Sequence, residues 1–246
     1  MAFVDYEHWY VSLLRNFNMR PDIGEWFSMI AQSVNLTEAF FFADFSHKSL
    51  SDEIRRIRPF SNKIIDTRNT NGATAKDYTD FIILDNMYQK AISSEETDVY
   101  VLFTGDGHFS SVCSFIKNIR GKEIWVYGVR NSFSRQLQDT ASKSIILPTQ
   151  QQLTAHNVSL VLSSLDTGEV SGSANLSKLI SSVAEKNRVR PEDVKTAAAE
   201  LTSKNYLTER TVTMRGGTKR TLLFVDWDKL GDDGVYERKK EASSVN

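Results

Sequence analysis

The stretch that decides the fold reads DVYVLFTGDGHFSSVCSFIKNIRGKEIWVYGV and spans residues 98–129. It opens with a continuous apolar run at 98–103 and closes with a second one at 123–129. Both runs are rich in β-branched and aromatic residues, which is typical of strands buried on two faces. A helix-length segment, about 109–119, lies between them. This order of strand, helix and strand predicts a parallel βαβ unit.

The same alternation continues through the first 150 residues. Further strands are predicted by short apolar runs at 2–6, 38–45, 63–67 and 144–147. Apolar residues recur with helical spacing over about 21–34, 75–92 and 132–142, and Pro21 suits the first turn of the first of these helices. We therefore expect an α/β domain over residues 1–150, in which helices cover both faces of a parallel sheet.

The remainder of the chain predicts a second, smaller domain. Residues 151–175 are rich in Gln, Thr, Ser, Gly and Asn, and we expect them to form a linker. Residues 176–231 predict two helices and a β-hairpin with Gly216-Gly217 at its tip, which is the outline of a winged-helix-like module. Residues 232–246 are polar and are expected to be a disordered tail.

The overall composition is that of an ordinary globular protein rather than a basic nucleic-acid-coating protein. The 246 residues are 40% hydrophobic and 25% charged, and the formal net charge is only -1. Charge is unevenly distributed, because residues 176–230 contain eleven Lys and Arg against seven Asp and Glu. Binding to nucleic acid would therefore depend on local basic patches.

The cysteine content and the N-terminal segment bear on the compartment. Cys113 is the single cysteine, so the chain forms no internal disulfide and no four-cysteine zinc site. A reducing, cytoplasmic setting is expected. The opening MAFVDYEHWY has neither a basic region nor a long apolar run, so we expect no signal peptide. No uninterrupted apolar run approaches 18 residues, and we expect no membrane partner.

Three aspartates fall where a parallel sheet places its functional site. Asp5 ends the first strand, Asp106 follows the strand at 98–103, and Asp80 lies in the helix before that strand. Carboxylates brought together without a cation repel one another, at a cost of several kcal/mol, unless one takes up a proton. The set therefore predicts a site for Mg²⁺ or Mn²⁺, which prefer oxygen ligands. Taken singly, Asp106 could be a helix N-cap and Asp80 an exposed helix residue.

Three segments resemble motifs of NYN domains. They are FVDYEHW at the first strand, AKDYTDFII in the helix that contains Asp80, and TGDGHFSSVCSFIKNIRGKEIWVYGV from Thr104 onward. The resemblance covers roughly residues 2–148. It implies a PIN-like fold, metal-dependent cleavage of RNA, and metal-binding, catalytic roles for Asp5, Asp80 and Asp106.

The sequence departs from the family pattern at three positions. His8 stands in place of an asparagine, His108 in place of a second acid, and Ser142 in place of a further aspartate. Fewer carboxylates would weaken metal binding. The histidines could act as softer ligands, as phosphate contacts or as acid–base groups, or they could be rim residues without a chemical role.

Two more acids are candidates for the rim of the site. Asp85 lies five residues after Asp80, a rotation of about 140° on a helix, and is expected to point away from it. Asp44 ends the second strand and could lie at the same sheet edge.

Basic residues flank the expected site and the hairpin, where they could contact phosphates without reading sequence. Each could equally be a solvated surface charge, and the C-terminal module could instead serve dimerisation or protein contacts. These cations are Arg68, Lys76, Arg130 and Arg135 near the strand ends, and Arg215, Lys219 and Arg220 in the hairpin.

Three functions compete on these observations. The first is a metal-dependent endoribonuclease whose partner is RNA. The second is a nucleic-acid-binding regulatory protein that keeps the NYN fold and has lost activity, which the replaced acids favour. The third, another phosphotransfer enzyme such as a phosphatase, is disfavoured because the chain has no Gly-rich phosphate loop and no nucleophile with a partner base. A second copy of the chain is a further candidate partner.

Overall fold

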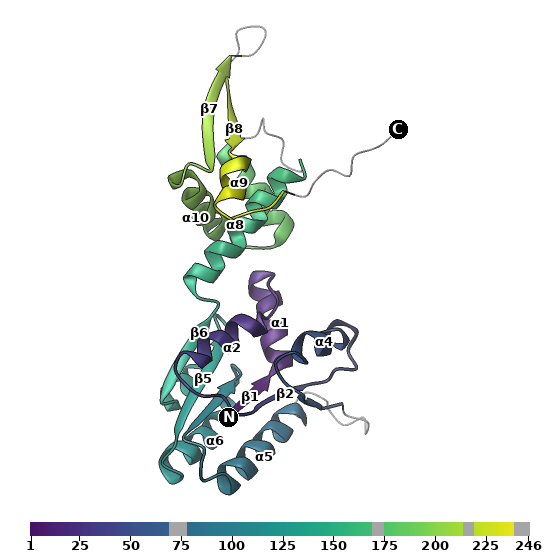
Figure 1. Ribbon diagram of the computed structural model, residues 1–246, viewed down its shortest axis with the longest axis vertical. Coiled ribbons are helices and arrows are strands. Elements are labelled where there is room, and N and C mark those ends of the chain that lie inside the picture. Colours follow the sequence, from purple (N-terminus) through teal and green to yellow (C-terminus); the bar gives the residue numbers. More distant parts are fainter. Residues whose placement is uncertain (69–77, 169–174, 214–218, 239–246) are drawn as a thin grey trace. The chain divides into compact units, whose positions relative to one another are not determined.

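The computed structural model describes residues 1–68, 78–168, 175–213 and 219–238. The chain forms two compact units, Met1–Leu147 and Pro148–Asn246 (Figure 1). Each unit has its own hydrophobic core, and each is described by itself.

The first unit is built on a six-stranded sheet in which every pair of neighbouring strands is parallel. The strand order is β3-β2-β1-β4-β5-β6. This confirms the predicted α/β fold with a parallel sheet. The strands are β1 (Ala2–Asp5), β2 (Ala39–Ala43), β3 (Lys63–Asp66), β4 (Val99–Phe103), β5 (Glu123–Val129) and β6 (Lys143–Leu147).

One face of the sheet is covered by α1 (Tyr6–Phe17) and α2 (Ile23–Ala31), as Figure 1 shows. Their contact with the sheet is largely aromatic. Trp9 stacks on Phe103 with ring centroids 4.1 Å apart, and Trp26 contacts both Phe103 and Tyr127. Fully buried aromatic side chains of this size remove large apolar areas from water, so they anchor both helices firmly.

The other face is covered by α5 (Tyr78–Ser93) and by the helical segment after β4 (Figure 1). That segment consists of a 3-10 turn (η2, Gly107–Phe109), α6 (Ser110–Ser114) and a π-helical turn (η3, Phe115–Ile119). Cys113 lies fully buried in this core, and burial raises the pKa of its thiol to about 12. It is therefore a packing residue and not a nucleophile. Shorter helices complete the unit: α3 (Lys48–Ser51), α4 (Glu53–Ile57) and α7 (Arg135–Thr140).

Helix α1 was not predicted from the sequence, since no helix was expected before Pro21. Its buried residues have helical spacing, but the helix follows β1 without an intervening loop. Asp5 ends the strand and also caps the helix, since its Oδ1 accepts a hydrogen bond from the backbone N–H of His8 at 3.0 Å. Pro21 likewise precedes α2 and is not in its first turn, because the N-cap is Asp22.

The second unit contains four helices and a hairpin among its described residues. Its buried core includes Val161, Leu179, Val183, Val194 and Leu223. The predicted order of helix, helix and hairpin is present, and an additional helix comes before it. The elements are α8 (Gln150–Asp166), α9 (Leu176–Asn187), α10 (Pro191–Ser203), β7 (Leu207–Thr213), β8 (Lys219–Val225) and α11 (Trp227–Asp232).

The expected linker over 151–175 is corrected by α8. This helix opens with a capping box, in which the side chain of Thr149 accepts from Gln152 N–H and the side chain of Gln152 accepts from Thr149 N–H. Its buried side chains Val158, Val161 and Leu162 belong to the core of the second unit. The Thr-x-x-Gln sequence is a typical start of a helix, but the polar composition of the segment favoured a linker.

Two predicted features lie partly outside the described residues. Residues 239–246 of the expected tail and the Gly216-Gly217 tip of the expected hairpin are not among the described residues. Tyr236, in the described part of the tail, packs against Trp227 with ring centroids 5.8 Å apart. Across the described ranges, no helix has both the length and the apolar character that crossing a membrane requires.

Candidate metal centre

The site lies where β1 and β4 end side by side in the centre of the sheet. The chain connections diverge from this pair of strands, and such a switch point leaves an opening beyond the carboxyl ends of the strands. Asp5 ends β1, and Thr104, Gly105 and Asp106 follow β4 directly. The fold therefore brings two of the three predicted acids to the same edge.

Asp106 is held by the turn that it begins. Its side chain caps η2 by accepting a hydrogen bond from His108 N–H at 2.9 Å. The same oxygen, Oδ1, lies 3.3 Å from Nδ1 of His108. The side chains of Asp106 and His108 are 38% and 75% exposed, so both can reach a ligand from solvent. The N-cap alternative for Asp106 is thus correct, and it coexists with a position in the acidic cluster.

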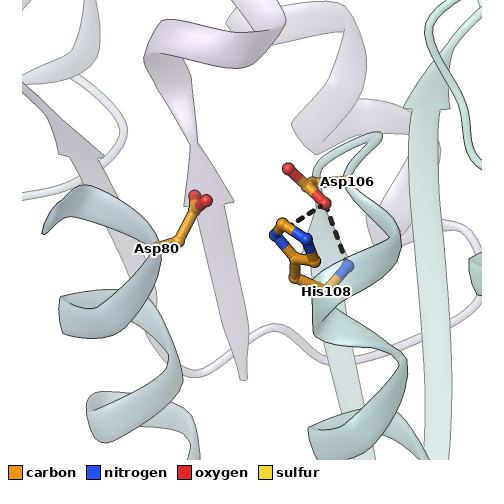
Figure 2. Close-up of side chains that lie close together, drawn as sticks. All are labelled: Asp80, Asp106 and His108. Atoms are coloured by element: carbon orange, nitrogen blue, oxygen red, sulfur yellow. Dashed lines mark hydrogen bonds and ion pairs between the residues drawn. The ribbon is translucent and has the colours of Figure 1, made fainter. Parts of the chain in front are cut away.

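Asp80 comes from the first turn of α5, across the sheet edge from Asp106. The hydroxyl oxygens of Thr67 and Thr79 are 2.7 Å apart, which ties the start of α5 to the end of β3. Ligand atoms of Asp80, Asp106 and His108 all lie within 4.8 Å of one another. Figure 2 shows the three side chains facing a common space between α5 and the loop after β4.

This donor set fits a divalent cation. Octahedral ligands of Mg²⁺ or Mn²⁺ stand roughly 3 Å apart when adjacent and about 4 Å apart when opposite. The three side chains therefore need only a small inward movement to share one ion. Two carboxylates suit either ion, and the imidazole of His108 adds a softer nitrogen.

Asp5 lies beside this group and is more deeply buried. It is 5% exposed, and its Oδ2 accepts a hydrogen bond from the hydroxyl of Thr104 at 3.1 Å. Burial raises the pKa of Asp5 to about 7, and the hydrogen bonds from His8 and Thr104 offset only part of this effect. Asp5 is not among the side chains whose ligand atoms converge within 4.8 Å, so its role as a direct ligand stays a prediction.

Thr104 connects the buried Asp5 to the more exposed Asp106, and it was not among the predicted site residues. It is completely buried. Its hydroxyl donates a hydrogen bond to Asp5 and accepts one from the backbone N–H of Asp106 at 3.4 Å. The threonine of the Thr-Gly-Asp sequence was visible, but only the pairing of β1 with β4 shows which acid it meets.

His8 lies next to the loop that carries Asp106. Burial lowers the pKa of its imidazole, although a hydrogen bond to the backbone of Ser132 and the charges of Asp106 and Asp80 oppose that shift. The direction of this shift favours the neutral imidazole over a protonated His8 that contacts phosphate. Asn16 donates to the hydroxyl of Ser132 at 2.9 Å, so α1 holds the loop after β5 at two points.

Three other predicted or family positions lie outside the cluster. Asp85 is exposed on α5 and accepts a hydrogen bond from Gln89. Asp44 follows β2; burial would raise its pKa, but hydrogen bonds from Ser46 hold the pKa below its ordinary value. Ser142 precedes β6 at the opposite end of the strands, where its hydroxyl accepts from Ile124 N–H. A carboxylate at 142 would therefore not reach this site, which corrects the expectation that its replacement weakens metal binding.

The flanking cations differ in how available they are. Arg135 begins α7 with its side chain 93% exposed and 4.0 Å from Asp139. Arg130 is half-buried after β5. Arg68 pairs with Asp66 at 3.4 Å. Lys219 and Arg220 are exposed on the hairpin of the second unit, and Lys76 and Arg215 lie outside the described residues.

Comparison with known proteins agrees with this fold. A crystal structure of a protein of unknown function from Vibrio parahaemolyticus matches with a TM-score of 0.52 and 20% identity, covering 60% of this chain and 91% of that chain. At this level of identity the likeness concerns the fold alone. None of the curated proteins matches the chain. Residues 1–148 match the NYN domain. Because that match spans more than half of the chain, the protein belongs to the NYN domain family, whose PIN-like fold is that of nuclease-type proteins.

Proposed function

We propose that this chain is a metal-dependent endoribonuclease, with Mg²⁺ or Mn²⁺ held by Asp80, Asp106 and His108. The observation that carries the proposal is the convergence of two carboxylates and an imidazole at the carboxyl edge of the sheet. Membership of the NYN family supports hydrolysis of a phosphodiester bond, and RNA is the substrate that the sequence resemblance implies.

A cation bound there would neutralise charge on the scissile phosphate and acidify a water molecule. The protein's own contribution is position. Asp106 is fixed by its capping bond, and Asp80 by the first turn of α5. Asp5, which interacts electrostatically with Asp106, can hold or release a proton near neutral pH, because its pKa is about 7. Arg135 is exposed beside the site and could bind a neighbouring phosphate of the strand.

A specific observation also favours the second candidate, a nucleic-acid-binding protein without hydrolytic activity. His108 occupies the position of a family acid and leaves only two carboxylates within the converging group. With less negative charge, affinity for a hard cation falls, and the site could bind phosphate groups without cleaving them.

Replacement of Asp106 by asparagine tests the catalytic site. Asparagine keeps the N-cap hydrogen bond to His108 N–H but removes the charge, so the fold is expected to survive. We expect Mn²⁺-dependent cleavage of labelled single-stranded RNA to fall at least about tenfold. Asp85→Asn makes the same chemical change at an exposed position of α5 outside the cluster, and should leave cleavage unchanged.

The outcomes separate the two candidates. Wild-type cleavage that EDTA abolishes and that Asp106→Asn strongly reduces supports hydrolysis at this site. An inactive wild type that still binds RNA supports the binding protein. Cleavage that survives Asp106→Asn at full rate places the chemistry elsewhere.

Replacement of His108 by aspartate should strengthen metal binding. The variant adds a third carboxylate next to Asp80 and Asp106, and oxygen ligands suit Mg²⁺ and Mn²⁺ better than an imidazole does. We expect the dissociation constant for Mn²⁺, measured by calorimetry, to fall about tenfold. His47→Asp, at an exposed position after β2, is the matched control and should change little. Unchanged affinity in His108→Asp would exclude residue 108 from the ligand set.

A further inference from the structure

The hairpin of the second unit has two chemically different faces. Residues that pair directly across an antiparallel ladder lie on the same side of the sheet. Leu223, paired with Glu209, is buried in the core, and Glu209 accepts a hydrogen bond from Leu176 N–H at the start of α9. That side faces the helices. The outer face of the hairpin is formed by the alternate pairs Thr208 and Phe224, Arg210 and Leu222, and Val212 and Arg220.

A cavity of about 630 Å³ opens at the base of this outer face. Phe224 and Arg210 of the hairpin, Tyr206 before it and Trp227 after it contribute to the lining. Its volume lies within the range of small-molecule sites, which run from roughly 300 to 1,000 Å³, and is ample for a single nucleobase with its ribose. The outer face and the cavity thus form one continuous surface.

Two arginines of the cavity lining lie over aromatic rings of the same lining. The guanidinium of Arg210 lies 5.1 Å from the ring centre of Phe224, and that of Arg238 lies 5.0 Å from the ring of Trp227. Phe224 nevertheless remains 39% exposed, although it stands at the edge of an apolar core. Exposed aromatic faces beside arginines are the elements on which the bases of single-stranded nucleic acids stack.

The charges of the lining select against a simple anion. The lining holds two cations, Arg210 and Arg238, together with the two carboxylates of Asp226 and Asp228, and Arg238 also pairs with Asp166 at 2.9 Å. A nucleobase is uncharged and carries both donors and acceptors on its edges, so it suits guanidinium donors next to carboxylate acceptors. Phosphates would be better placed further along the outer face, toward Arg220, where no acid belongs to the outer face.

We propose that this cavity binds an unpaired base of a single-stranded nucleic acid, whose backbone follows the outer face of the hairpin past Arg210 to Arg220. A base within a duplex would first have to leave its stack, which costs a few kcal/mol, so duplexes are poorer ligands. The inference rests on the proposed nucleic-acid substrate but not on its cleavage.

Binding of the full chain to short fluorescent RNA, in EDTA to prevent cleavage, tests the cavity. The single strand is expected to bind at least about tenfold more tightly than the same sequence as a duplex. Phe224→Leu keeps an apolar side chain but removes the ring, and should weaken single-strand binding about tenfold. Phe224→Tyr keeps the ring and should bind within about twofold of wild type, which separates stacking from a folding defect. Single-stranded DNA should show the same loss in Phe224→Leu, because stacking uses the base.

Arg220 lies on the outer face, and Lys195, an exposed cation of α10, is its matched control. Arg220→Gln should weaken binding and should lower the salt dependence of binding by the amount expected for one phosphate contact. Lys195→Gln should do neither. Equal effects of the two variants, normal binding by Phe224→Leu, or duplex binding as tight as single-strand binding would each overturn the inference. A wild type that binds as expected but cleaves nothing with Mn²⁺ would refute the proposed hydrolysis and leave this site standing.

Discussion

Replacing Asp5 by asparagine is expected to make the metal-free protein more stable at neutral and alkaline pH, by up to roughly 4 kcal/mol. Asp5 is 5% exposed, and burial raises its pKa from 3.8 to about 7. Asparagine can still accept from His8 N–H, and its amide nitrogen can donate to the hydroxyl oxygen of Thr104, which reverses the bond that Asp5 accepts from this hydroxyl. It carries no charge that must be buried.

The direction of the pH dependence follows from linkage. The folded state binds the Asp5 proton more tightly than the unfolded state does, because the folded pKa is the higher one. The stability that this proton contributes is complete below pH 3.8 and is lost as the pH rises to about 7. Asp5→Asn should remove this decline and should leave the stability at pH 4 almost unchanged.

Calorimetric melting in EDTA from pH 4 to pH 8 measures the effect on the first unit. Asp22→Asn is the matched control, because Asp22 caps α2 through the same kind of hydrogen bond but is exposed. Added Mn²⁺ should stabilise the wild type more than Asp5→Asn, since a nearby cation favours an ionised Asp5. If the stability of the wild type relative to Asp5→Asn does not fall between pH 4 and pH 7, the pKa of Asp5 is not raised by burial, and the prediction is wrong.

Replacing Gly105 by alanine should destabilise the first unit by about 1–3 kcal/mol and disrupt the proposed metal centre. A Cβ atom at this position would lie 1.7 Å from the backbone oxygen of Ser132 and 2.5 Å from Nε2 of His8. The loop cannot easily withdraw, because Ser134 N–H donates to the carbonyl of Gly105 at 2.9 Å. Relief of the clash must therefore displace Asp106, which is the next residue.

Mn²⁺ titration and calorimetric melting of Gly105→Ala measure the two parts of this prediction. Gly231→Ala is the control, since a Cβ there meets no atom within 4 Å and the residue is helical, so the change should be neutral or slightly stabilising. A Gly105→Ala protein with normal stability and normal Mn²⁺ affinity would show that the loop yields without moving the acid.

Much of the fold could be predicted from local patterns. The six strands of the first unit were predicted within about two residues, because each is a short apolar run bounded by polar segments. The central strands β1, β2 and β4 are almost wholly buried, whereas the edge strands β3 and β6 are more exposed. Helix α1 was missed because it continues directly from β1, with Asp5 serving both elements. Helix α8 was missed because its composition is polar. The Thr-x-x-Gln sequence at Thr149 marks its start, but only the structure shows that Val161 of this helix is buried in the core of the second unit.

The order of residues along the chain determined which candidate metal-binding groups this protein carries. It placed Asp5 at the end of a strand and Asp106 after another, and it placed His108 where a further acid would stand. Only the tertiary structure decided that His108 joins Asp80 and Asp106, that Asp5 is buried beside them, and that Ser142 lies at the opposite end of the sheet. The physical reason is that strand neighbours and burial arise from packing between distant segments, and a linear pattern specifies the face of each element but not its partner.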